Sequence, residues 1–145
     1  MGRMFTQSRE EVRSHFINVR EKMGLEVQLE PLEQMLANVI KQHPEYHPVL
    51  DDPAVALAAE YAEDMATSNP FLHMSLHVAI AEQLQTDRPS GVVKAYNVLL
   101  GKRSLGPHAV EHKMIDCLRA SLWQAQRDSC PPDEAAYLTC LVCTT

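Results

Sequence analysis

Apolar residues recur along the chain at the three- and four-residue spacing of an α-helix. Residues at this spacing share one face of a helix, and that face can pack into a core. Proline, glycine or capping residues separate the apolar runs, and no run alternates between apolar and polar positions as a strand does. The pattern therefore predicts an all-α bundle of six or seven helices. The predicted helices cover residues 9–24, 31–43, 53–65, 70–86, 90–100, 108–127 and 133–141.

The predicted helices begin and end at residues that stabilise helix termini. Ser8 and Glu11 have the spacing of a capping box, and Gly24 is a plausible stop for the helix that follows. Asn69 can cap the helix that starts at the next residue, a proline. Gly101, together with Gly106 and Pro107, predicts a break before the longest helix.

Two histidines lie inside an apolar stripe of the helix predicted for residues 70–86. His73 and His77 are four residues apart, so they project from one helical face. The same face carries Leu76, Ile80 and Leu84. Buried imidazoles need partners, because a buried polar group without one is costly. The stretch is compatible with a bound metal ion, and equally with histidines that bond to core carbonyls or carboxylates.

Six of the seven histidines fall in three pairs with this four-residue spacing: His43/His47, His73/His77 and His108/His112. Random placement of seven histidines would give about 0.3 such pairs. Three pairs on separate segments therefore predict that three segments contribute to one metal site, as in other helical bundles. Pro44 disfavours regular helix at His43, and HPEYHPVLDDP is predicted to be a turn or a kinked extra turn.

Glu111 lies between the histidines of the third pair and points with the apolar face of its helix. It is either a further metal ligand or a carboxylate that complements the helix dipole. A donor set of imidazoles with few carboxylates favours iron or zinc over magnesium and calcium. The chain contains no HExxH sequence of the zinc peptidases. The metal's identity, and whether one or two ions bind, stay open.

Length, charge and cysteine content narrow the class of protein. The chain has 145 residues, a net charge of −6 and no basic stripe, which excludes typical nucleic-acid binding. No apolar run approaches the ~18 residues of a membrane span, so no membrane partner is expected. Four cysteines without an export signal predict a reduced, cytoplasmic protein. Residues 4–145 are predicted to form one domain, after a disordered start at residues 1–3.

The sequence does not decide whether the protein is an enzyme. It has no P-loop, dinucleotide-binding glycines or nucleophile elbow. A single CxxC, at Cys140 and Cys143, is weak support for a zinc or redox site. The alternative to a metal-binding protein is a structural or protein-interaction module whose core histidines are hydrogen-bonded. The substrate stays unknown, and a homo-oligomer stays an option.

Four stretches carry a resemblance to a known family: HPEYH, TSNPFLHMSLHVAIAEQL, HAVEHKMIDCL and LWQAQRDSCPPDEAAYL. From Met4 onward the chain resembles a bacterial family known only as a domain of unknown function (number eighteen forty-one). The resemblance implies a bacterial cytoplasmic protein and no particular activity. More loosely, the layout is similar to the metal-binding hemerythrin-like and DinB-like bundles. The HxxxH of His73 and His77 fits the hemerythrin pattern, whereas Pro44 and Pro48 interrupt the first histidine pair.

Overall fold

The computed structural model describes residues 8–60, 69–103 and 106–143. These residues form eight α-helices and one short 3₁₀ helix, with no strand among them, which confirms the all-α prediction. They divide into two compact units, and the boundary falls between Val78 and Ala79, inside helix α5 (Pro70–Thr86). Among the described helices, none is both long and apolar enough to cross a membrane.

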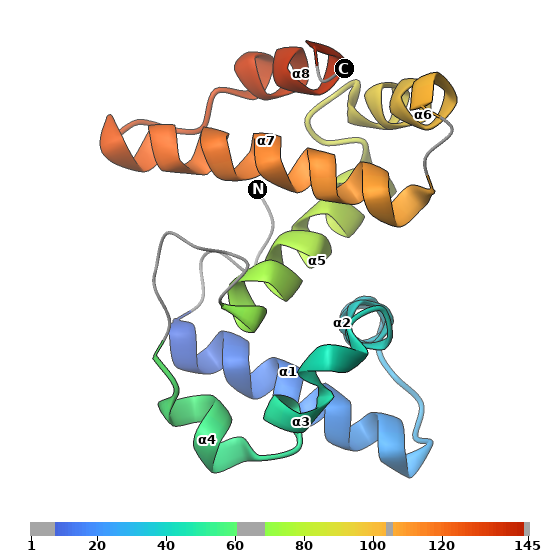
Figure 1. Ribbon diagram of the computed structural model, residues 1–145, viewed down its shortest axis with the longest axis vertical. Coiled ribbons are helices and arrows are strands. Elements are labelled where there is room, and N and C mark those ends of the chain that lie inside the picture. Colours follow the sequence, from blue (N-terminus) through green and yellow to red (C-terminus); the bar gives the residue numbers. More distant parts are fainter. Residues whose placement is uncertain (1–7, 61–68, 104–105, 144–145) are drawn as a thin grey trace. The chain divides into compact units, whose positions relative to one another are not determined.

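The N-terminal unit is built around α1 (Arg9–Leu25). Helices α2 (Pro31–Lys41), α3 (His47–Leu50) and α4 (Pro53–Ala58) all pack against α1 (Figure 1). The apolar faces predicted from the sequence supply the core of this unit, because burying one large apolar side chain stabilises the fold by about 1.5–3 kcal/mol. Fully buried members of this core are Phe16, Leu36, Ile40, Leu50 and Met74.

The ends of the helices follow the predicted capping residues with two exceptions. The Ser8 hydroxyl accepts the Glu11 N–H at 3.2 Å, as the capping box predicts. The predicted stop at Gly24 is wrong, because α1 runs to Leu25 and the left-handed residue that ends it is Glu26 (φ 55°). The predicted break is wrong at Gly101, since a glycine inside a helix costs only about 1 kcal/mol, and α6 (Val92–Arg103) continues through it. It is confirmed at Gly106 and Pro107, where the next helix begins.

A buried arginine ends α4 earlier than the sequence predicts. The predicted helix extended to residue 65, but α4 ends at Ala58 and the next residue, Ala59, is extended (φ −62°, ψ 138°). The Arg13 side chain, only 2% exposed, donates from Nη1 to the Ala56 carbonyl at 2.8 Å and the Ala59 carbonyl at 2.7 Å. A side chain from α1 thus satisfies carbonyls that another helical turn would have satisfied. Residues 61–65 of that prediction lie outside the described residues.

The C-terminal unit contains the second half of α5, α6, α7 (Pro107–Arg127) and α8 (Glu134–Cys143). Helix α8 packs against both α6 and α7, and α6 packs against α7 (Figure 1). A disulfide between Cys117 and Cys140 joins α7 to α8, and Cys130 and Cys143 are exposed thiols. The expectation of four reduced cysteines is therefore wrong for one pair.

Candidate metal centre

His43 lies in the turn that follows α2, outside the helix. The following proline disfavours helical geometry, and His43 takes φ −129° and ψ 64° after α2 ends. Its Nδ1 lies 2.8 Å from the Val39 carbonyl oxygen. A carbonyl can only accept, so Nδ1 carries the proton and Nε2 of the neutral ring carries the lone pair. The turn therefore buries a histidine (3% exposed) with its tautomer defined.

Tyr46 lies over His43 because the intervening turn is a 3₁₀ helix, η2 (Pro44–Tyr46). Side chains three residues apart eclipse one another in such a turn. The two rings are stacked, with centroids 5.4 Å apart and planes inclined by 4°. Burial and the neighbouring Glu45 carboxylate raise the pKa of Tyr46, so its phenol stays neutral. The histidine pattern did not single out Tyr46, although its position three residues after His43 and two after Pro44 was a usable signal.

His73 and His77 of α5 approach each other and the His43 ring within the N-terminal unit. Their ring centroids are 4.7 Å apart, and their Nε2 atoms are 3.2 Å apart, so one ring donates to the other. The His43 centroid lies 5.0 Å from that of His73 and 4.7 Å from that of His77. His77 is 2% exposed, as its place in the apolar stripe predicts. Three of the predicted site histidines are therefore neighbours in this unit.

His47 has a different role from its pair partner. Its Nε2 lies 2.9 Å from the Ile40 carbonyl oxygen, so this nitrogen carries a proton and donates. The carbonyls of Val39 and Ile40 belong to the last turn of α2, where the backbone bonds tighten to three-residue spacing. Val39 accepts the Gln42 N–H and Ile40 accepts the His43 N–H, each at 3.1 Å. The His43 and His47 rings each add a side-chain hydrogen bond to one of these carbonyls. Only Nδ1 of His47 could then bind a metal ion.

The third predicted pair lies in the first turns of α7, in the C-terminal unit. The His108 and His112 ring centroids are 4.3 Å apart. Glu111 places Oε2 3.9 Å from Nδ1 of His108, and its side chain is mostly shielded from solvent. Burial and the Glu111 carboxylate raise the pKa of Tyr96 on α6. This carboxylate therefore has a local electrostatic effect on the unit in addition to its place near the helix N-terminus.

Within the N-terminal unit, the ring nitrogens of His43 and His77 are candidate metal ligands, and within the C-terminal unit those of His108 and His112 are candidates. Neutral imidazole is a ligand for zinc, iron, nickel and copper, and a poor one for magnesium and calcium. The chemistry of this donor set fits the transition metals that the sequence predicts.

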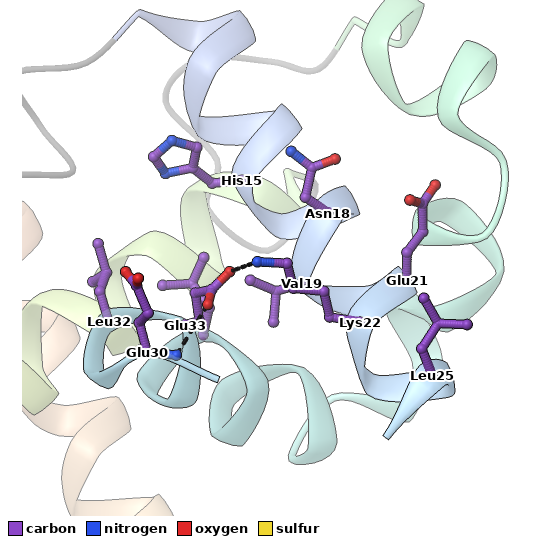
Figure 2. Close-up of a pocket in the computed structure, with 10 residues that line it drawn as sticks. His15, Asn18, Val19, Glu21, Lys22, Leu25, Glu30, Leu32 and Glu33 are labelled. Carbon is purple, nitrogen blue, oxygen red and sulfur yellow. Dashed lines mark hydrogen bonds and ion pairs between the residues drawn. The ribbon is translucent and has the colours of Figure 1, made fainter. Parts of the chain in front are cut away.

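A cleft between α1 and α2 is lined by residues outside the three histidine pairs (Figure 2). Glu33 dominates its polar side, where its carboxylate pairs with the Lys22 ammonium and accepts the Glu30 N–H at 3.0 Å. The Glu30 backbone bond and the Lys22 side chain hold the pKa of Glu33 below its usual value. His15, the one histidine outside the three pairs, lines this cleft. It is therefore a suitable control residue for tests of metal binding.

The family comparison covers nearly all of the described chain. The model of a family described as a domain of unknown function (DUF1841) matches residues 8–142. The chain belongs to this family. Membership confirms the resemblance seen in the sequence, but it does not extend to the hemerythrin-like and DinB-like bundles. No curated protein and no solved structure matches the chain.

Proposed function

We propose that this protein binds a transition-metal ion through histidine nitrogens. The observation that carries the proposal is the approach of the His73 and His77 Nε2 atoms to 3.2 Å. Two imidazoles bound to one zinc ion, each at about 2.0–2.1 Å, keep their nitrogens roughly 2.9–3.4 Å apart for bond angles of about 90–110°. This spacing suits a shared ion, which would displace the proton that one ring donates to the other.

The surroundings of His43 support its inclusion in the proposed site. Histidine ligands commonly donate their second ring N–H to a carbonyl or carboxylate, which fixes the tautomer and the direction of the ligating nitrogen. The bond from Nδ1 of His43 to the Val39 carbonyl has this form. His43 is also in ring contact with both His73 and His77.

We propose the donors of the C-terminal unit as a second, separate set of candidate ligands. His108 and His112 project from adjacent turns of α7, and Glu111 supplies a shielded carboxylate between them. Imidazoles with one carboxylate suit iron and zinc. His47 ranks last in the proposed set, because its Nε2 is committed to the Ile40 carbonyl. We also place the protein in the bacterial cytoplasm, where the family resemblance suggests that it acts.

Metal uptake by tag-free protein tests the proposal. The purified chain is stripped with a chelator and titrated with Zn²⁺, and anaerobically with Fe²⁺. We expect uptake of a stoichiometric ion and a loss of affinity in His77→Ala of about 10-fold or more. His15→Ala is the matched control and should bind as the wild type does. Failure of the wild type to take up zinc, iron, nickel or copper would end the proposal.

Two further variants ask whether the C-terminal unit binds metal. In His108→Ala and His112→Ala, weaker binding is expected if α7 supplies nitrogens to the ion. Wild-type affinity in both variants, together with a loss in His77→Ala, would limit the site to the N-terminal unit. Titration to one or two equivalents decides between a mononuclear and a dinuclear site.

The second candidate function is a structural or interaction module with hydrogen-bonded histidines. The bonds from His43 and His47 to the carbonyls that end α2 favour it, since they give both rings a role without metal. In that case His77→Ala would lower the melting temperature of metal-free protein. Added metal would change the melting temperature of neither the wild type nor His77→Ala. Metal-dependent stabilisation of the wild type alone would favour the first candidate.

A further inference from the structure

We propose that Tyr46 is a positioning residue for the ligand His43, because its stacked ring holds the imidazole plane. The inference rests on the proposed metal-binding function. It adds a residue that positions a ligand and is not itself a ligand. Its first support is the parallel stack of the two rings, at 5.4 Å between centroids and 4° between planes. Such a stack restricts rotation of the imidazole ring about its Cβ–Cγ bond.

The backbone of η2 brings the two rings together. Pro44 pushes His43 away from helical geometry and begins the 3₁₀ turn. The Tyr46 N–H donates to the His43 carbonyl at 3.0 Å, which closes the turn. The turn formed by the HPEY sequence therefore brings residue 46 close to residue 43.

Tyr46 is itself held in place, so it can act as a support. Its ring is partly buried against the core of the N-terminal unit. Its edge also faces the His73 ring, at 6.3 Å between centroids and 78° between planes. The tyrosine thus contacts two of the three histidines that lie together in this unit.

The stack and the Val39 bond restrain different motions of the His43 ring. The hydrogen bond fixes which nitrogen is protonated and where Nδ1 points. The stack fixes the plane, and hence the direction of the Nε2 lone pair. Without the stack, the His43 ring would become ordered only when metal binds. The entropic cost of that ordering should weaken metal affinity by roughly 3- to 10-fold.

Zinc affinity of three variants tests the proposal. Tyr46→Leu removes the stack and keeps an apolar side chain, so its zinc dissociation constant should rise by roughly 3- to 10-fold. Tyr46→Phe keeps the ring and should bind within about twofold of the wild type. Val49→Ala, a change in another residue packed on the same core, is the matched control. It should lower the melting temperature without changing zinc affinity.

A second measurement on metal-free protein reads the His43 ring directly. NMR relaxation of the His43 ring should show an ordered imidazole in the wild type and in Tyr46→Phe, and a more mobile one in Tyr46→Leu. The Nδ1–H tautomer, which the Val39 bond fixes, should be the same in all three. Wild-type zinc affinity together with unchanged mobility of the His43 ring in Tyr46→Leu would overturn the proposal. If the wild type binds no zinc, metal binding fails as the function, and the NMR comparison alone decides whether Tyr46 orients His43.

Discussion

At the scale of single residues, Tyr137 shows how one buried hydroxyl connects distant helices. Its hydroxyl donates to Oε1 of Gln83 at 2.7 Å, and both side chains are buried in the C-terminal unit. The two residues are 54 positions apart, so the bond links α8 to the second half of α5. Burial raises the pKa of Tyr137 well above its usual value, against a smaller opposing effect of the Gln83 bond.

Tyr137→Phe should destabilise the protein by about 1–3 kcal/mol, because it leaves the buried Gln83 oxygen without its donor. Urea unfolding followed by circular dichroism measures the change. Tyr96→Phe, at a less buried tyrosine, is the control and should cost less. Equal stability of wild type and Tyr137→Phe would mean that this bond adds nothing to the folded state.

The raised pKa of Tyr137 predicts that the protein loses stability at alkaline pH. The tyrosine's folded pKa is raised above the unfolded value of about 10, so its contribution is complete below pH 10 and declines as pH rises above 10. There the unfolded chain ionises while the folded chain keeps the proton. Urea midpoints from pH 8 to 11 should therefore fall less steeply for Tyr137→Phe than for the wild type. Parallel curves would contradict this account.

At the scale of secondary-structure elements, the disulfide is the main covalent constraint between described helices. It joins Cys117 of α7 to Cys140 of α8 across 23 positions of sequence. Closing such a loop limits the unfolded chain and stabilises the folded one by about 3 kcal/mol in the chain-entropy description. The α7–α8 packing therefore combines apolar burial with a cross-link.

Cys140→Ser should lower the free energy of unfolding by about 3 kcal/mol, and dithiothreitol should bring the wild type to a similar value. Cys143→Ser alters an exposed thiol in the same helix and should have little effect. The measurement is urea unfolding with and without reductant. Alkylation of all four cysteines, when cells are lysed in denaturant with the alkylating reagent present, would show that the bond does not form in the cell.

At the scale of the whole molecule, a bound metal ion would link folding to metal concentration. The unfolded chain has no assembled site, so an ion that binds the folded state stabilises it by mass action. The protein would then depend on free metal for part of its stability. Metal-binding imidazoles must also be neutral, and imidazole titrates near pH 6.5.

Chelator should lower the melting temperature of metal-loaded protein by about 5–10 °C at pH 7.5, if metal is present at about 100 times its dissociation constant. The shift should shrink near pH 5, because protonated imidazoles no longer bind the ion. His77→Ala should lose the response, and His15→Ala should keep it. Differential scanning calorimetry measures both. An undiminished shift at pH 5 would argue against imidazole ligands.

Part of the candidate site could be predicted because helical spacing is local. Residues four apart share a face whatever the rest of the chain does, so His73 and His77 were expected together, as were His108 and His112. The burial of His77 followed from its apolar neighbours on the same face. The bounds of α5 and α7 followed from the period of apolar positions and from the prolines at their first turns.

The sequence alone determined the helical class, most helix starts, the histidine pairs and the turn at HPEY, since each depends on neighbours within one or two turns. Tertiary structure decided the rest, because it depends on groups far apart in the chain. Arg13 ends α4 from 43 positions away, and Cys117 finds Cys140 across 23. His43 meets His73 and His77 only once the core of the N-terminal unit has packed α2 and the start of α5 together. No local pattern contains such contacts, because the free energy that forms them comes from burying the whole core.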